Sequence, residues 1–288
     1  MNQALRITHY WQLIRPGLLV TILFSMAMAA FTTGQDVPPW PRLAHSLAGT
    51  AMLIAGALAM NQRLERRSDA TMARTAERPL PSRGLTPREV TTFSVLSSAM
   101  GVVYLLLLAT WTVVWMAAMS WAIYVLIYTP LKRVTVWHTP VGAVAGAIPM
   151  LLGAATAEAV LTPLSLVLFG AVFFWQLPHT MAIAWIYRRQ YQVGTVKVAT
   201  VVEPSGRLAG WWAAFGAGCL LLVSLVPPML SLAGWGFGGV ALLLGAAHLA
   251  VAARFLRRRD DATARTLWRV SLLHLPALLL ALVIAVRC

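Results

Sequence analysis

Long apolar runs, separated by shorter polar segments, make up most of the chain. A helix needs about 20 apolar residues to cross the hydrocarbon core of a bilayer, whereas a membrane barrel shows alternating segments of about ten residues. We therefore expect one membrane-embedded, all-α domain over residues 1–288. The apolar runs predict nine transmembrane helices, near residues 17–33, 43–60, 90–108, 111–128, 140–157, 161–187, 209–227, 233–253 and 270–286.

The composition excludes most other classes of protein. Of the 288 residues, 59% are hydrophobic and only 11% are charged, whereas soluble domains carry roughly 25% charged residues. A water-soluble fold and a disordered chain are both inconsistent with these values. The two cysteines, Cys219 and Cys288, are too few for a disulfide scaffold.

Positive charges fall on alternate loops between the predicted helices. The formal net charge is +14, and every lysine and arginine except Arg42 and Arg287 lies on one side of the predicted topology. By the positive-inside rule this side is cytoplasmic, so we expect the N-terminus inside and the C-terminus outside a cytoplasmic (inner) membrane. The bilayer is then the partner that explains the charge, and no nucleic acid is needed.

A polar stripe continues the second predicted helix out of the membrane. Asn61, Glu65 and Asp69 recur every four residues, which puts them on one helix face. Magnesium takes one or two carboxylates and receives its remaining oxygens from water and substrate phosphates. Nearby arginines, among them Arg74 and Arg78, offer forked donors for the same phosphates. The stripe predicts a magnesium–diphosphate site; the alternative is a solvated loop whose charges only set the topology.

The loop after this stripe carries signals of ordered structure. Residues 79–84 are rich in proline and glycine, which is typical of a compact turn. Thr86 then provides a helix N-cap, Pro87 the first helical residue and Glu89 the second half of a capping box. We therefore expect residues 61–89 to fold rather than to trail in solvent.

The motifs of the chain resemble those of the UbiA-type intramembrane prenyltransferases, over roughly residues 10–288. The stripe, followed by Arg74 and Arg78-Pro79-Leu80-Pro81-Ser82, is similar to the first aspartate-rich motif of that superfamily. Within it, the chain is most similar to the protoheme IX farnesyltransferases, or heme O synthases. This similarity lies in Lys132-Arg133-x-Thr135, Gly142-x3-Gly146-Ala147-x-Pro149-x3-Gly153, Trp175-Gln176-x-Pro178-His179, Tyr191-x2-Gly194 and Ser271-Leu272-Leu273-His274-Leu275.

The resemblance implies a helical bundle around a central cavity that opens to the cytoplasmic side and the lipid. It also implies that farnesyl diphosphate would bind there with Mg²⁺, that its allylic C–O bond would ionise, and that the vinyl group of heme B would attack the farnesyl carbon. Water then captures the cation to give heme O. Magnesium and arginines stabilise the departing diphosphate. Heme A synthase or assembly factors of a terminal oxidase are the implied protein partners.

The resemblance also assigns roles to single residues. Asn61, Glu65 and Asp69 correspond to metal ligands, and Asn61, Asp69 and Lys132 to residues needed for catalysis; Glu65 stands where the family more often has Asp. The substrate-binding set is Arg74, Arg78, Arg133, His179, Tyr124, Tyr128 and Arg188.

Several of these residues also have structural interpretations. Lys132 and Arg133 contact a diphosphate or a heme propionate, or they only anchor a helix end. His179 is a ligand of heme iron or is satisfied by a neighbouring helix. Tyr124 and Tyr128 stabilise a carbocation with their ring faces or pack helices.

One segment departs from the family pattern. Relatives usually carry a Lys-Asp-Asp-Tyr-like stretch after the sixth helix, and here it is Arg188-Arg189-Gln190-Tyr191. Three interpretations stay open: one magnesium ion suffices, with Arg188 or Arg189 on the diphosphate; the enzyme is weakly active; or the acceptor differs. The competing functions are therefore another UbiA-type prenyltransferase, acting on an aromatic or quinone precursor, and a non-catalytic paralogue that binds heme or an isoprenoid. A transporter is disfavoured, because the ionisable residues cluster at the cytoplasmic helix ends.

Overall fold

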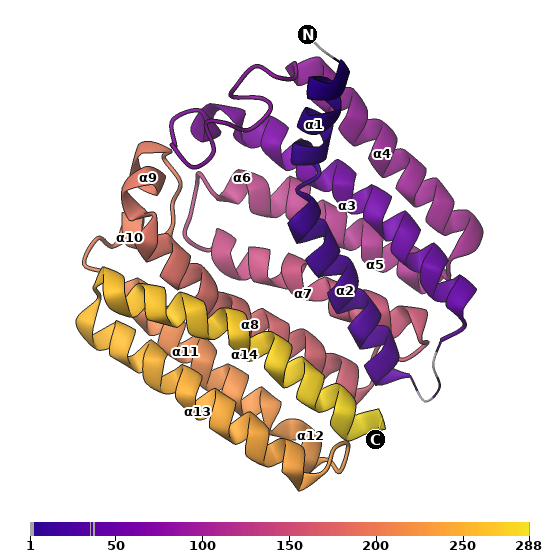
Figure 1. The fold of residues 1–288 in the computed structure, drawn as a ribbon, viewed down its shortest axis with the longest axis vertical. Helices are drawn as coiled ribbons and strands as arrows, with labels where there is room; N and C mark the ends of the chain where they lie inside the picture. The colour runs from indigo at the N-terminus through magenta and orange to yellow at the C-terminus, as the bar shows by residue number, and fades with distance from the viewer. Residues whose placement is uncertain (1–2, 35, 37, 288) are drawn as a thin grey trace.

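The computed structural model describes residues 3–34, 36 and 38–287, and within these ranges all regular structure is helical (Figure 1). The nine predicted spans are confirmed in the described part of the chain, and the protein is a multi-pass membrane protein. The spans are α2 (Pro16–Thr33), α3 (Trp40–Asp69), α4 (Pro87–Leu108), a fourth over Trp111–Leu131, α7 (His138–Thr156), α8 (Pro163–Ile186), a seventh over Arg207–Met229, α13 (Trp235–Arg258) and α14 (Asp261–Arg287).

Two spans are composite, and three short helices lie outside the spans. The fourth span joins α5 (Trp111–Ala122), a π-helix η1 (Ile123–Tyr128) and α6 (Thr129–Leu131). The seventh joins α11 (Arg207–Ser224) and α12 (Val226–Met229). The short helices are α1 (Gln3–Leu13), α9 (Arg188–Val193) and α10 (Ala199–Val202).

Helix boundaries differ from the sequence prediction where polar residues enter a helix. α3 continues to Asp69, as its polar stripe predicted. α14 begins at Asp261 rather than near residue 270, because charged residues in its first turns hide the helix from a hydropathy pattern. The Asp260 carboxylate accepts a hydrogen bond from the Thr263 backbone N–H at 2.7 Å, which satisfies a free donor at this helix start.

The spans form two groups that meet along α7 and α8. Figure 1 shows α1–α6 on one side of the bundle and α11, α13 and α14 on the other. α8 packs against α7, α11 and α14, and α14 also contacts α2. The first and last spans are therefore neighbours, and among the described residues the odd number of spans means that α2 enters the bundle at one end and α14 leaves it at the other.

Small residues let these helices approach closely. A Cβ atom on Gly153 would lie 2.0 Å from the Met26 carbonyl oxygen, across the α2–α7 contact. A Cβ on Gly101 would lie 2.7 Å from the Leu53 backbone nitrogen, across the α3–α4 contact. In a bilayer, packing of this kind replaces the hydrophobic effect as the force between helices.

The loop between α3 and α4 is folded, as its turn and cap residues predicted. Thr86 caps α4 by accepting from the Glu89 backbone N–H, and the Glu89 side chain accepts from the Thr86 N–H at 2.8 Å. Leu80 and Leu85 of the loop are buried with Leu13 of α1. α1 has no counterpart in the predicted elements, and it covers this loop, because Gly84 lies against the His9 ring.

The close α2–α7 contact yields a test of the packing. We expect Gly153→Ala to lower stability by about 1–3 kcal/mol, because the methyl group has no space and forces the helices apart. Gly218→Ala is the matched control: a Cβ there meets nothing within 4 Å, and losing a helical glycine stabilises by roughly 0.5–1 kcal/mol. Thermal unfolding in detergent checks both. A Tm for Gly153→Ala equal to or above that of the control would contradict the packing.

Candidate active site

The polar stripe of α3 faces the end of the fourth span. The Asn61 amide Nδ2 donates a hydrogen bond to Thr129 Oγ1 at 2.9 Å. Glu65 Oε1 forms an ion pair with Lys132 Nζ at 2.7 Å. Since Thr129 and Lys132 both lie at the end of the fourth span, the stripe is turned toward the bundle and not toward solvent.

Asp69, the last residue of α3, holds the loop that follows it. Its side chain is buried, and its Oδ2 accepts from Arg78 Nη1 at 2.7 Å. The Thr75 hydroxyl donates to the Asp69 carbonyl oxygen at 2.9 Å. Asp69 thus fixes both the path of the loop and the position of the Arg78 guanidinium.

A π-helix shapes the other wall of this site. η1 places one extra residue in the turn before Thr129, and such segments are frequent at functional sites. The Thr129 hydroxyl donates to the Tyr124 carbonyl oxygen at 2.8 Å while it accepts from Asn61. The Tyr124 and Tyr128 rings lie 5.4 Å apart between centroids.

Lys132 is held as a cation between these walls. Its Nζ lies 4.3 Å from the centroid of the Tyr128 ring, in addition to its pair with Glu65. Burial by itself lowers the pKa of Lys132, but the Glu65 carboxylate and the Tyr128 and Tyr124 oxygens outweigh burial and raise it. Lys132 therefore stays protonated, and it occupies a face of the Tyr128 ring.

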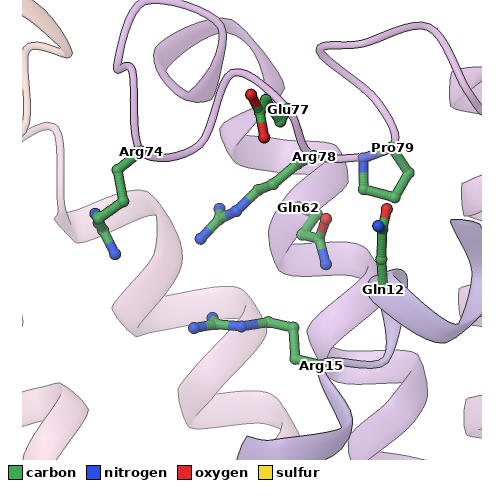
Figure 2. Close-up of a pocket in the computed structure, with 7 residues that line it drawn as sticks. All are labelled: Gln12, Arg15, Gln62, Arg74, Glu77, Arg78 and Pro79. Atoms are coloured by element: carbon green, nitrogen blue, oxygen red, sulfur yellow. The ribbon is translucent and has the colours of Figure 1, made fainter.

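Three arginines from different segments point toward one cavity of about 190 Å³. Figure 2 shows Arg74 and Arg78 of the loop and Arg15 at the α1–α2 junction directed into the same space. The other lining residues are Gln12, Gln62, Glu77 and Pro79. The forked donors of arginine suit phosphate oxygens, so this cavity can hold a phosphorylated ligand.

Arg15 is the member of this group that sequence reasoning missed. In the sequence it is one of several basic residues that precede an apolar run. Its backbone is in the left-handed region (φ 49°, ψ 67°) between α1 and Pro16, the first residue of α2. Gln62 fixes the junction by donating to the Leu13 carbonyl oxygen at 2.7 Å.

The segment that departs from the family pattern holds Arg74. The Gln190 side-chain oxygen accepts from the Arg74 backbone N–H at 3.1 Å. The Tyr191 hydroxyl accepts from Arg74 Nη2 at 3.3 Å, and the guanidinium lies 5.1 Å from the centroid of the Tyr187 ring. Burial raises the pKa of Tyr191, which keeps its phenol neutral. α9 therefore binds the loop of the first motif directly.

Two predicted substrate-binding arginines have other partners in the structure. Arg188 pairs with Asp261 of α14 at 2.7 Å and lies over the Trp185 ring. Arg133 donates to the Leu64 carbonyl oxygen at 3.3 Å. This contact lies near the C-terminal end of α3, where a positive charge interacts favourably with the helix dipole. Arg15, Arg74 and Arg78 thus line one cavity, whereas Arg188 and Arg133 do not belong to its lining.

His179 lies on α8, within the C-terminal half of the bundle. Its Nδ1 is 2.8 Å from Ser271 Oγ, and its ring stacks on Trp175 with centroids 4.8 Å apart. The Ser271 hydroxyl gives its proton to the Trp268 carbonyl oxygen at 2.7 Å. Ser271 must therefore accept from His179, so that Nδ1 carries the proton and Nε2 keeps a lone pair.

The donor set on α3 fits a magnesium ion that substrate phosphates complete. Among the described residues, no group of three or more His, Cys, Asp or Glu side chains lies close enough to hold a metal by itself. Asn61, Glu65 and Asp69 offer one amide and two carboxylates, in the range that magnesium takes when phosphate and water supply the remaining oxygens.

Comparison with known proteins identifies the family. The UbiA prenyltransferase family model matches residues 18–281. A protein of Opitutus terrae named protoheme IX farnesyltransferase is 35% identical over 289 residues, which covers 97% of this chain and 95% of the relative.

Solved structures agree on the fold. A structure of digeranylgeranylglyceryl phosphate synthase superimposes with a TM-score of 0.82 at 15% identity, covering 98% of both chains. A UbiA homologue from Archaeoglobus fulgidus bound to DMAPP and Mg²⁺ gives a TM-score of 0.68 at 12% identity, covering 95% of this chain and 98% of the other. With the family model matched over most of its length, the chain belongs to the UbiA prenyltransferase family.

Proposed function

We propose that this prenyltransferase transfers the farnesyl group of farnesyl diphosphate to the vinyl group of heme B, giving heme O. The observation that carries the proposal is the convergence of Arg15, Arg74 and Arg78 on one cavity beside the α3 stripe. The choice of heme B as acceptor rests on the name of the Opitutus relative at 35% identity. The use of a prenyl diphosphate with Mg²⁺ is supported by the fold shared with the DMAPP-bound homologue.

The residues of the site act mainly on the leaving group. Breaking the allylic C–O bond builds negative charge on the diphosphate, and fixed cations aimed at that charge lower the barrier. Arg15, Arg74 and Arg78 take this role in the cavity, and Lys132 adds a permanent charge nearby. Mg²⁺ on Asn61, Glu65 and Asp69 supplies further charge neutralisation when it is bound.

The heme acceptor belongs on the other side of the reacting carbon. His179 keeps a lone pair on Nε2, as its bond to Ser271 requires, and a neutral imidazole of this kind can ligate heme iron. Tyr124 offers an aromatic ring toward a carbocation, whereas Lys132 covers a face of Tyr128. Arg133 and Arg188 then act only indirectly on substrate binding: Arg133 contacts the end of α3, and Arg188 connects α9 to α14.

The altered second motif favours a site with one metal ion. Gln190 and Tyr191 hold Arg74 by hydrogen bonds, so α9 needs no bridging ion to contact the first motif.

We assign the whole chain to one prenyltransferase domain in a cytoplasmic membrane, with the N-terminus and the site on the cytoplasmic side. Heme A synthase or oxidase assembly factors would receive the product.

A product assay tests the function directly. Membranes that contain this chain, supplied with heme B, farnesyl diphosphate and Mg²⁺, are expected to form heme O, measured by mass spectrometry. Chelation of Mg²⁺ should abolish the product. Membranes without the chain are the blank, and an active relative is the positive control. Folded protein that forms no heme O would overturn the choice of acceptor, and an aromatic acceptor or a non-catalytic role would replace it.

The stripe is tested by exchanging one of its acids. Asp69→Asn is expected to lower kcat by roughly 10²–10³-fold, because Asp69 would hold Mg²⁺ and positions Arg78, the cations that stabilise the departing diphosphate. Glu77→Gln is the control, because Glu77 lines the same cavity but is exposed and forms no ion pair among the described residues. It removes a negative charge from the phosphate cavity, so activity should hold or rise. Equal losses in both variants would contradict a specific role for Asp69.

The Glu65–Lys132 pair predicts a non-additive stability effect. Glu65→Gln leaves Lys132 buried without its carboxylate, which should lower Tm more than the double variant Glu65→Gln/Lys132→Met does. Because the pKa of Lys132 is raised in the folded protein, the stability from this pair is fully present below about pH 10. It is lost only as the pH rises through the folded pKa.

Thermal unfolding at pH 7 and pH 10 is expected to show the same loss of Tm in Glu65→Gln, because both pH values lie below the folded pKa of Lys132. Glu65→Asp, which keeps the charge, should restore both Tm and activity. Additive losses in the double variant would show that the two side chains do not depend on each other.

A further inference from the structure

The outward face of α13 combines small residues with unpaired arginines. Leu243, Ala246, Ala247 and Ala250 are exposed along the helix, and Arg254, Arg257 and Arg258 follow at its end. At 100° per residue, Ala250, Arg254 and Arg257 lie within about 60° of one another around the axis. Phe255, on the opposite side, is fully buried. This face therefore points away from the bundle, at whose edge α13 lies (Figure 1).

The arginines of this face surround a concavity of about 420 Å³, lined by Ala250, Arg254, Arg257 and Arg258. In the part of the chain that the structure describes, none of the three arginines forms an ion pair or a side-chain hydrogen bond, although Arg258 interacts electrostatically with the Asp260 carboxylate. The adjacent Asp260 carboxylate is bound to the Thr263 backbone and hydroxyl. Three forked donors are thus left for a ligand of opposite charge.

We propose that this face binds an anionic phospholipid. The phosphate lies between Arg254, Arg257 and Arg258, and an acyl chain follows the shallow path over Ala250, Ala247 and Ala246. α13 is a membrane-spanning helix, so its arginine end lies at the level of the headgroups and its alanines lie among the chains. Basic groups at this level attract anionic lipid, and arginine binds phosphate oxygens with paired donors.

A lipid suits this surface better than a second copy of the chain. Exposed small residues are also typical of helix dimers. Two copies packed on this face would bring six arginines together, whereas the Asp260 carboxylate near them already accepts hydrogen bonds from Thr263, and like charges in close contact repel. An anionic headgroup instead neutralises them.

Native mass spectrometry of the full chain in detergent tests the proposal. Dioleoyl phosphatidylglycerol is the probe, and dioleoyl phosphatidylcholine, with the same chains, is the neutral comparison. We expect the triple variant Arg254→Gln/Arg257→Gln/Arg258→Gln to weaken phosphatidylglycerol binding roughly 100-fold, at about fivefold per arginine. Ala250→Leu, which fills the concavity and changes no charge, should weaken it as well, and it carries the test if the triple variant does not fold.

A charge-matched control separates a site from general attraction. Arg67→Gln/Arg88→Gln/Arg207→Gln removes three exposed arginines from three other helices and should leave phosphatidylglycerol binding within a few fold. Equal losses in both triple variants would overturn the proposal, as would equal binding of phosphatidylcholine. Displacement of the lipid by inorganic phosphate, at constant ionic strength, would assign the site to free phosphate. A dimer that phosphatidylglycerol disrupts would assign the face to a second copy.

Discussion

The free-energy cost of burying charged side chains next to a membrane determines how the segments around the site are arranged. A carboxylate removed from water stays charged only if a cation and hydrogen bonds compensate it. Asp69 is buried at the end of α3, and Arg78 supplies that cation at 2.7 Å. To reach Asp69, the chain has to turn back within nine residues, which defines the loop. Glu65 likewise needs a cation to compensate its charge, and its ion pair with Lys132 holds the end of the fourth span against α3.

These pairs explain why the surrounding backbone is irregular. The π-helix η1 directs Thr129 between Asn61 and the Tyr124 carbonyl oxygen, and it precedes Lys132 by four residues. The left-handed Arg15 turns the chain from α1 into α2 and directs a guanidinium into the cavity. Unfavourable backbone geometry of this kind persists where the surroundings determine it, and such positions cluster at functional sites. Regular helices carry the spans, and the irregular residues gather around the proposed leaving group.

The sequence predicts those features that depend on local periodicity. The nine spans, the extension of α3 and the capping box at Thr86 follow from apolar run length, four-residue spacing and cap chemistry, and the structure confirms them. The π-helix and the conformation of Arg15 could not be predicted, because they result from packing between segments far apart in the chain. The same limit applies to Arg188. Its place in the second motif predicts a phosphate contact, yet its partner Asp261 lies 73 residues away along the chain.

The replacement of acids in the second motif changes the charge balance of the site. Arg15, Arg74, Arg78 and Lys132 face only Glu65, Asp69 and Glu77 among the residues described around the cavity and stripe. Cations therefore exceed carboxylates before any ligand binds. A second pair of aspartates would reverse that balance and would need a further metal ion to restore attraction for an anion. With Gln190 and Tyr191 in that place, Arg74 is positioned by neutral hydrogen bonds, which leave its charge available for the proposed contact with the diphosphate. In the proposed mechanism, the Arg74 guanidinium then supplies the positive charge that a second ion would otherwise bring.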